Sequence, residues 1–208
     1  MTSADLYLEK VNLLKYLNKT DCTKCGLTSC EEFISALMNG TKKPQDCPFL
    51  SKNKAYAFEV TLRLKDLWPD VPLLTHPRPS LIGLVELNSP DTESLVLISG
   101  NNEHTEQVLL TVLGTTIGPF FIIFVDTDGN TVDMAMIYQT MTAERIYKAL
   151  KESGLEKKTS KREMIVPGLT APIKEDIEKL TNWSVKVGPV CAAELPLFLS
   201  EFWTPPGA

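Results

Sequence analysis

Apolar residues in the second half of the chain follow two alternating patterns. Short apolar runs typical of strands occupy residues 81–87, 95–99, 120–126, 163–166 and 183–187. Helical spacing of apolar residues is found at residues 103–113, 142–154, 172–180 and 191–202. The unbroken run at 120–126 predicts a strand buried on both faces, and Asp128-Gly129 predicts a hairpin turn leading into residues 131–138. Strands alternating with helices predict a three-layer, Rossmann-like α/β domain with a mostly parallel sheet.

The first part of the chain has a different pattern. Helical spacing of apolar residues predicts helices at residues 3–17, 31–38 and 51–68, the first capped by Ser3. Four prolines then fall within residues 69–79, a density that neither a helix nor a central strand tolerates. We therefore expect a small helical module at residues 1–50, a helix with a proline-rich junction at 51–80, and the α/β domain at 81–208.

Four of the five cysteines lie in the small module. Cys22, Cys25, Cys30 and Cys47 have the spacing C-x2-C-x4-C-x16-C. The first three cysteines lie in one short loop. Gly40 favours a turn that brings the chain back to them at Cys47. A [4Fe–4S] cluster needs four thiolates around a compact core, and this unit supplies them. We expect the apolar face of the 31–38 helix to cover the cluster, and Gly26 to allow close backbone approach.

Two other uses of these cysteines are weaker. Structural zinc usually takes two facing C-x2-4-C knuckles, whereas Cys47 has no Cys or His beside it. Disulfides need an oxidising compartment, and residues 1–17 are not a signal peptide because they carry Asp5, Glu9 and Lys10. Iron–sulfur chemistry is the leading hypothesis.

Composition narrows the class of protein. The 208-residue chain has 43% hydrophobic residues and a net charge of −5, which argues against a nucleic-acid partner. The longest apolar run, residues 117–125, is about half of a membrane span. We expect a cytoplasmic protein without a membrane association. With no acid/base pair or nucleophile constellation in the sequence, a carrier protein is favoured over a stand-alone enzyme.

Two glycine turns lie where predicted strands end. Val166-Pro167-Gly168 and Val187-Gly188-Pro189 precede predicted helices. Ligands of open α/β sheets bind at the carboxyl ends of strands, where glycine lets the backbone approach them. The plainer interpretation is two tight strand–helix turns.

Taken together, these segments resemble the large (gamma) subunit of the corrinoid iron–sulfur protein of the CO dehydrogenase/acetyl-CoA synthase system. The cysteine module resembles that family's [4Fe–4S] module, including Lys-Cys-Gly and Asp-Cys-Pro. Its corrinoid-binding domain is similar to the segments at 125–129, 149–156, 165–171, 187–189 and 193–196. The likeness covers about residues 5–50 and 80–203, and the family's central TIM barrel is missing. The cysteine module alone is also similar to that of the B subunit of ion-translocating ferredoxin oxidoreductases.

The resemblance implies a cluster that supplies electrons to a corrinoid in anaerobic methyl transfer (the acetyl-CoA pathway), where cobalt carries the methyl group. It implies partners such as a methyltransferase, a small corrinoid-protein subunit or a redox protein. The loops at 99–104, 131–142, 167–170 and 188–193 would hold the corrinoid. The implied contacts are Gly100, Asn101, His104, Met134, Thr140, Gly168, Leu169, Thr170, Gly188, Pro189 and Ala192.

The chain departs from that pattern in one segment. Met134 stands where the family has a threonine under the cobalt, and residues 137–140 replace its Ala-Ala-Gly-Lys turn. An alternative function is therefore an electron-transfer or partner-docking accessory protein whose α/β domain has lost the corrinoid.

Two further residues are candidates for ligand or redox chemistry. His104, expected in a loop after a strand, is a candidate cobalt ligand, although its polar neighbours favour a surface histidine. Cys191, expected at a helix N-terminus, is a candidate thiolate, although such a cysteine is more often a small buried hydrophobe.

Overall fold

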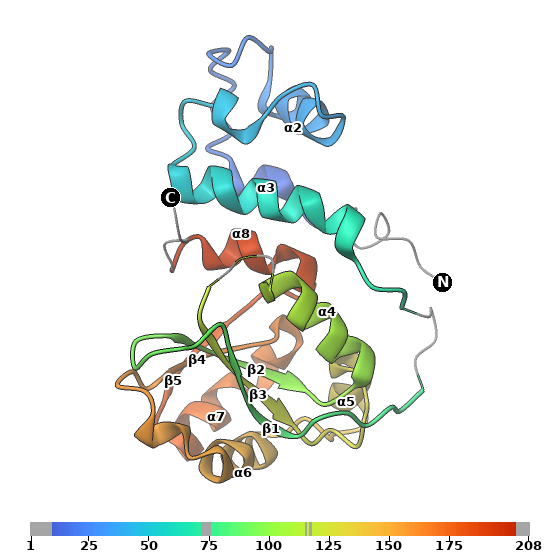
Figure 1. Cartoon of the computed structure of the whole chain (residues 1–208), viewed down its shortest axis with the longest axis vertical. Coiled ribbons are helices and arrows are strands. Elements are labelled where there is room, and N and C mark those ends of the chain that lie inside the picture. Colours follow the sequence, from blue (N-terminus) through green and yellow to red (C-terminus); the bar gives the residue numbers. More distant parts are fainter. Residues whose placement is uncertain (1–9, 72–75, 115, 117, 203–208) are drawn as a thin grey trace.

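A five-stranded sheet in the order β1-β3-β2-β4-β5 forms the centre of the computed structural model (Figure 1). The structure describes residues 10–71, 76–114, 116 and 118–202. The strands are β1 (Gly83–Leu87), β2 (Leu95–Gly100), β3 (Phe120–Val125), β4 (Glu163–Val166) and β5 (Ser184–Val187). Strands β3, β2, β4 and β5 are parallel, and β1 pairs antiparallel with β3, Gly83 opposite Phe124. The expected mostly parallel sheet is confirmed.

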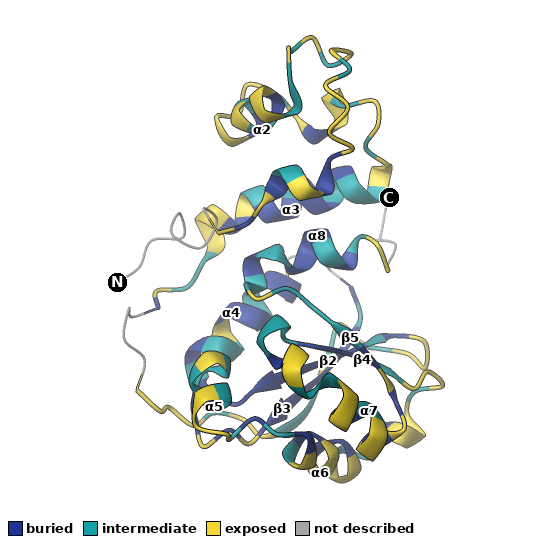
Figure 2. Cartoon of the chain, turned by 180° about the vertical axis from the view of Figure 1, so that it is seen from behind, coloured by how far each residue is buried: buried dark blue, intermediate teal, exposed yellow. Residues whose placement is uncertain are grey.

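Helices cover both faces of this sheet, which gives the three layers of the fold (Figures 1 and 2). They include α4 (Glu103–Gly114) and α8 (Leu195–Leu199) on one face, and α5 (Val132–Ile137), α6 (Ala143–Ser153) and α7 (Lys174–Thr181) on the other. The side chains of β3 alternate between the two cores, and all six of its residues are buried. The prediction of a strand buried on both faces is therefore confirmed.

Short 3-10 helices connect several of these elements. They are η3 (Leu155–Lys157), η4 (Gly168–Ile173) and η5 (Ala192–Glu194). The helix expected from residue 172 is split between η4 and α7, and the last helix is η5 followed by α8. Helix α6 begins after the cap Thr142 and ends at Gly154, whose φ of 64° is the left-handed conformation that ends helices.

The segment after Asp128-Gly129 is a correction to the sequence prediction. Residues 132–137 form helix α5, which begins directly after Thr131, and do not extend a hairpin. The Asp128-Gly129 turn does not connect two strands of a hairpin. Instead, Asn101 Oδ1 accepts hydrogen bonds from the backbone N–H of Thr127 and of Gly129, at 2.8 and 3.2 Å. These bonds tie the turn to the end of β2, so the chain leaves it as a βα connection.

The N-terminal module packs on the face of the sheet that carries α8. It contains η1 (Leu13–Tyr16), α2 (Cys30–Met38), η2 (Pro44–Asp46) and α3 (Lys52–Leu67). Ser51 caps α3 and Asn39 ends α2, in agreement with the sequence. The helix expected at 3–17 is only a 3-10 turn in its described part, and its cap Ser3 lies outside the described residues. One hydrophobic core joins the module to the sheet.

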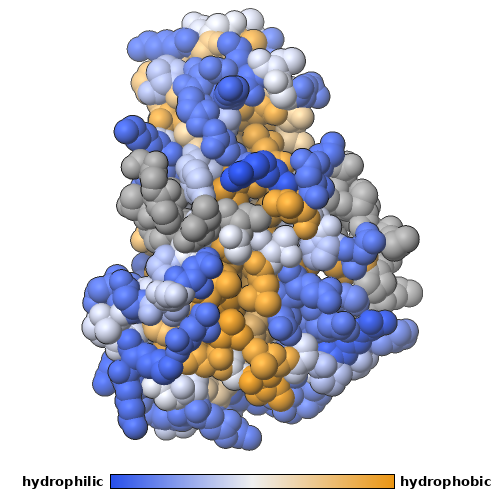
Figure 3. Space-filling model, in the orientation of Figure 1, coloured by the Kyte–Doolittle hydropathy of each residue, from blue (hydrophilic) through white to orange (hydrophobic). Residues whose placement is uncertain are grey.

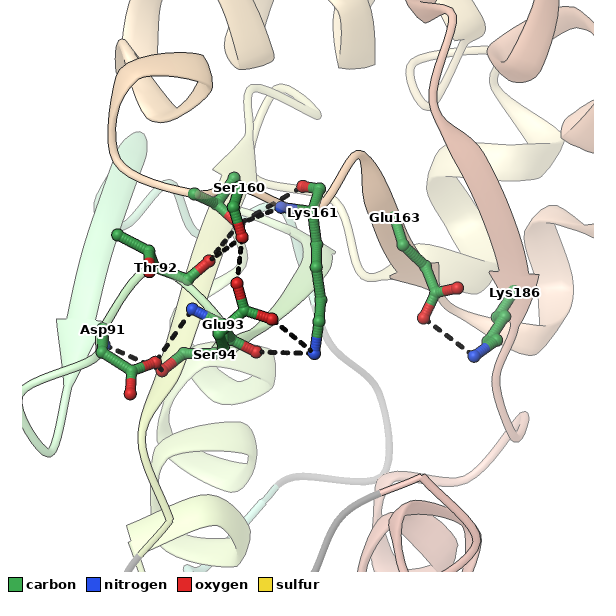
Figure 4. Close-up of polar contacts among 9 residues, drawn as sticks. Asp91, Thr92, Glu93, Ser94, Ser160, Lys161, Glu163 and Lys186 are labelled. Carbon is green, nitrogen blue, oxygen red and sulfur yellow. Dashed lines mark hydrogen bonds and ion pairs between the residues drawn. The ribbon is translucent and has the colours of Figure 1, made fainter.

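Polar contacts tie together the amino ends of β2 and β4 (Figure 4). The Ser160 N–H donates to Thr92 O at 2.9 Å, and Lys161 Nζ donates to Glu93 O at 3.2 Å. Lys186 of β5 pairs with Glu163 of β4 at 2.8 Å. Backbone and side-chain contacts therefore close this end of the sheet.

Strand β1 lies at one edge of the sheet beside apolar surface. Leu81 and Ile82, which precede it, are exposed. Figure 3 shows a band of apolar surface on the face where β1 lies. An apolar edge strand offers unpaired backbone groups and side chains to another chain.

Candidate metal centre and strand-end crevice

The four clustered cysteines line one small cavity at the end of the molecule that carries α2. Its volume is about 20 Å³, and Phe33 and Leu17 contribute to its wall. Cys22, Cys25, Cys30 and Cys47 are half-buried free thiols. The structure thus brings together side chains that are up to 25 positions apart in the sequence. Among the described residues, no three Cys, His, Asp or Glu side chains lie close enough to bind a single ion.

Hydrogen bonds shape the loop that presents these thiols. Asp21 Oδ1 accepts from the backbone N–H of Cys30 at 2.6 Å, which closes the loop on the start of α2. Ser29 caps that helix by accepting from Glu32 N at 3.1 Å. Lys42 Nζ donates to Cys25 O at 2.9 Å and so ties the returning chain to the first cysteines. The loop geometry is held by groups other than the thiols.

Gly26 and Phe33 position the wall of the cavity. Gly26 has a φ of 82°, in the region that side chains disfavour, and an added Cβ would meet nothing within 4 Å. The backbone conformation therefore favours glycine at this position. Close approach of its backbone to a cluster stays a prediction. Phe33 is buried as expected, whereas Met38 of the same helix is exposed. The helix face that was expected to cover the cysteines is therefore buried only in part.

A larger crevice lies at the carboxyl ends of β2, β4 and β5. Its volume is about 440 Å³, within the usual range for ligand pockets. The chain runs from β2 outward to β3 on one side and to β4 and β5 on the other, so the crevice lies at the topological switch point of the sheet. Ligands of open α/β sheets bind at this point.

All four loops expected to hold a ligand contribute to this crevice. Of the candidate residues, the structure brings together His104, Leu169, Gly188, Pro189 and Ala192. Lys10, Trp68 and Val71 of the N-terminal part also line it, and the sequence analysis missed them. No local motif marks these three, because they reach the crevice through tertiary packing alone.

The remaining candidates lie outside the lining, and several of them build its support. Asn101 Oδ1 and the Thr140 hydroxyl bond to the backbone or side chain of Thr127. Gly100 lies against the same Thr127, and the Thr170 hydroxyl donates to Pro167 O at 2.7 Å. Met134 is half-buried in α5.

The two glycine turns are joined to each other. The Gly168 N–H donates to Pro189 O at 3.0 Å, and the Gly188 N–H donates to Val166 O at 2.8 Å. A Cβ on Gly168 would come within 2.7 Å of Val190 N. Glycine is therefore required at 168 because the backbones of the two turns approach closely. Approach of these glycines to a ligand stays a prediction.

His104 occupies a different setting from the expected surface loop. It is the second residue of α4, it is only 8% exposed, and it lines the crevice. Its neighbours Asn101 and Asn102 are fully buried, because their side chains hydrogen-bond inward to the backbone. Both ring nitrogens of His104 are buried without a hydrogen-bond partner among the described residues.

Cys191 also lines the crevice, at the start of the short η5 helix. Burial raises the pKa of its thiol, although backbone N–H groups of Ala193 and Glu194 oppose the shift. The raised pKa favours the protonated thiol, and the side chain is half-buried.

Residues 10–17, which include η1, run between the cysteine cavity and the crevice. Leu17 lines the first and Lys10 the second. Between them, the Tyr16 hydroxyl donates to Glu194 Oε1 at 2.6 Å, three residues beyond Cys191. The seven residue steps from Lys10 to Leu17 span at most about 25 Å even when extended. Within the described residues, no helix is long and apolar enough to cross a membrane.

Two family models match separate parts of the chain, one at the α/β domain and one at the cysteine module. A family model described as "CO dehydrogenase/acetyl-CoA synthase delta subunit" matches residues 74–199, and one described as "Putative Fe-S cluster" matches residues 17–49.

Curated relatives match only with part of their length. The acetyl-CoA decarbonylase/synthase complex subunit gamma of Methanopyrus kandleri is 28% identical over 70% of this chain and 34% of its own length. That of Methanocaldococcus jannaschii is 25% identical over 93% of the chain and 40% of its length. The corrinoid/iron-sulfur protein large subunit of Moorella thermoacetica is 32% identical over 62% of this chain and 28% of its own length. The chain thus spans two fifths or less of each of these relatives.

Proposed function

Because the chain belongs to the CO dehydrogenase/acetyl-CoA synthase delta subunit family, we propose that it is an iron–sulfur redox protein of anaerobic methyl-transfer metabolism. In this proposal a [4Fe–4S] cluster in the small module supplies electrons to a corrinoid in the strand-end crevice. The name of the Moorella relative, a corrinoid/iron-sulfur protein, supports the pairing of the two cofactors.

The observation that carries the proposal is the convergence of four cysteines on one cavity. Zinc would hold each thiolate at about 2.3 Å, which brings the sulfurs close together. A cubane of four irons and four sulfides takes four thiolates around a larger core, and four cysteines line this cavity. The half-buried setting beside Phe33 would limit solvent access, which tunes the cluster potential.

The position and the lining of the crevice support a corrinoid as its ligand. Backbone segments at Pro167, Gly188 and Pro189 offer close approach to a flat ligand, and apolar side chains such as Leu169 and Val108 form the walls. When bound, the corrinoid would supply a cobalt that accepts and releases a methyl group. The protein's own contribution would be to seat it, to exclude water and to hold the electron donor nearby.

Helix η1 supports electron supply from one site to the other. Tyr16 and Leu17 are buried in the core that joins the module to α4 and α8. The separation between cluster and crevice is thereby fixed by packing.

A second candidate function is an electron-transfer or docking accessory without a corrinoid. The end of α5 favours it, since Ile137 and Tyr138 are 69% and 58% exposed where the resembled family has small residues. These exposed apolar side chains suit a protein partner as well as a cofactor.

Anaerobic purification with metal analysis tests the proposal. We expect about four irons and four sulfides per chain, brown absorption, and cobalt after loading with a corrinoid. Serine at Cys22, Cys25, Cys30 or Cys47 should lower the iron content, while the control Cys191→Ser should leave it unchanged. A colourless protein with one zinc would refute the cluster. Full iron and sulfide without corrinoid uptake would favour the accessory function.

A further inference from the structure

Positive charge is concentrated in the cysteine module, although the chain as a whole is acidic. Residues 10–54 carry eight lysines and four acidic residues, whereas the whole chain has 21 basic and 26 acidic residues. The α/β domain therefore carries the excess of negative charge. Such a separation of charge steers a partner of opposite sign toward one end of a molecule. The cysteine cavity lies at the positive end, which carries α2 (Figure 1).

The acidic residues of the module are bound by its own backbone. Asp21 and Asp46 each accept a hydrogen bond from a backbone N–H within the module, at 2.6 and 2.8 Å. Glu32 Oε2 accepts from both the N–H and the hydroxyl of Thr28, each at 2.8 Å. Three of the four carboxylates are thus partnered by neutral donors, and none of the three forms an ion pair with a lysine among the described residues.

Several lysines of the module are correspondingly left without a carboxylate partner within the described part of the chain. They are Lys19, Lys24, Lys43 and Lys52, and all four are exposed. By contrast, Lys15 and Lys54 pair with glutamates of the α/β domain at 3.2 and 2.9 Å. The uncompensated positive charge of the module is therefore available to another molecule.

Two of these lysines and an exposed aromatic ring lie at the rim of the cysteine cavity. Phe49 lines the cavity and is 45% exposed. Lys24 Nζ lies 5.0 Å from the centre of the Phe49 ring, a cation–π contact that holds this charge at the rim. Lys19 stands in the sequence between two residues that line the cavity. An exposed ring beside lysines is typical of a protein-docking surface, because the ring supplies contact area and the charges supply orientation.

We propose that Lys19, Lys24 and Phe49 form the docking surface for an electron-carrier protein that is acidic around its own redox centre. The inference rests on the proposed function and deepens it, because it names the surface and the charge of the redox partner. Docking there brings the partner's redox centre beside the four thiols. The carrier then loses one electron, and the cluster gains it. Electron-transfer complexes of this kind are small and weak, so electrostatic attraction decides how often they form.

The sign of the salt dependence tests this docking surface. The partner used is an acidic plant-type [2Fe–2S] ferredoxin, titrated anaerobically into the cluster-loaded full chain in a calorimeter, with both proteins oxidised. A net charge of −5 spread over the whole molecule would repel it, so added salt would strengthen binding. The local surface predicts the opposite, and we expect the affinity to fall by about tenfold from 20 mM to 200 mM ionic strength.

A matched pair of variants locates the surface. Lys24→Gln and Lys157→Gln remove the same charge, but Lys157 is exposed in η3, which follows α6 at the other end of the molecule (Figure 1). We expect Lys24→Gln to weaken binding at low salt by about twofold to fivefold and to flatten the salt dependence, and Lys157→Gln to change neither. Phe49→Ala should weaken binding at every salt concentration. A carbodiimide, which couples lysines to carboxylates in contact with them, should crosslink Lys19 and Lys24 to the ferredoxin.

The outcomes separate the docking surface from the proposed function. Iron content, sulfide content and visible absorption equal to those of the wild type show that each variant holds its cluster. Binding that is absent or strengthens with salt, an equal loss in Lys157→Gln, or crosslinks confined to the α/β domain refute the docking surface and leave the cluster function standing. A single-stranded oligonucleotide that binds more tightly than the ferredoxin also refutes it. A chain that takes up no iron overturns both.

Discussion

Replacing Tyr16 by phenylalanine tests the contact that joins the cysteine module to the α/β domain. The Tyr16 hydroxyl donates to Glu194 Oε1 at 2.6 Å, and the Glu194 side chain is only 13% exposed. A hydrogen bond to a buried charged group contributes about 1.5–3 kcal/mol. We therefore expect Tyr16→Phe to lower the free energy of unfolding by about 2 kcal/mol, or the melting temperature by roughly 4–8 °C for a domain of this size.

A second contact to the same oxygen provides the internal comparison. Lys15 Nζ lies 3.2 Å from Glu194 Oε1, but its side chain is 62% exposed. Exposed ion pairs contribute about 0–1 kcal/mol, so Lys15→Ala should have the smaller effect. Tyr147→Phe removes a hydroxyl from a side chain that is 37% exposed and should be neutral.

The pH dependence provides an independent check. Burial, followed by the hydrogen bond to Glu194, raises the pKa of Tyr16 above its ordinary value of 10.0. The folded state then holds the phenolic proton more tightly than the unfolded state. The resulting stabilisation is complete below pH 10 and falls by about 1 kcal/mol between pH 10 and pH 11. Tyr16→Phe should lack this component of the decline.

Urea unfolding under anaerobic conditions, at equal cluster content, measures both effects. The midpoint should shift while the slope with denaturant stays constant. Equal midpoints for Tyr16→Phe and Tyr147→Phe, or an unchanged alkaline decline in Tyr16→Phe, would show that the contact does not join the two parts.

Two further substitutions test the two sites. Gly168→Ala places a Cβ 2.7 Å from Val190 N and should cost about 1–3 kcal/mol in thermal unfolding, whereas Gly114→Ala has open space and should be neutral or stabilising. Phe33→Ala removes a fully buried ring beside the cysteines, so we expect a loss of about 3–5 kcal/mol and faster bleaching of the brown absorption in air. Unchanged bleaching would mean that Phe33 does not shield the cluster.

The strands and the two glycine turns could be predicted because their signals are local. The apolar run of β3 and the Val-Pro-Gly and Val-Gly-Pro turns each describe their own surroundings. The cysteine spacing also predicted that four thiols converge, and the structure places all four on one cavity. What these thiols bind stays a prediction.

The errors came from polar residues that face inward. Asn101, Asn102 and Glu103 suggested a surface loop around His104, yet both asparagines are fully buried. The same Asn101 redirects Asp128-Gly129 from a hairpin into the start of α5. A polar sequence is uninformative about exposure when its side chains replace missing backbone partners, and only the three-dimensional arrangement reveals this.

The continuous core decides how the two proposed cofactors would communicate. Leu17 and Phe33 belong to the same hydrophobic core as the helices on the sheet. The cysteine module is therefore packed against the α/β domain and is not a separate unit on a flexible linker. Part of the proline-rich segment is also bound to the α/β domain, since the Arg78 N–H donates to Gly129 O at 2.8 Å. On the proposed function, the cluster would therefore stand at one distance from the crevice. Electron supply would then depend on the packed side chains between them and not on a large domain motion.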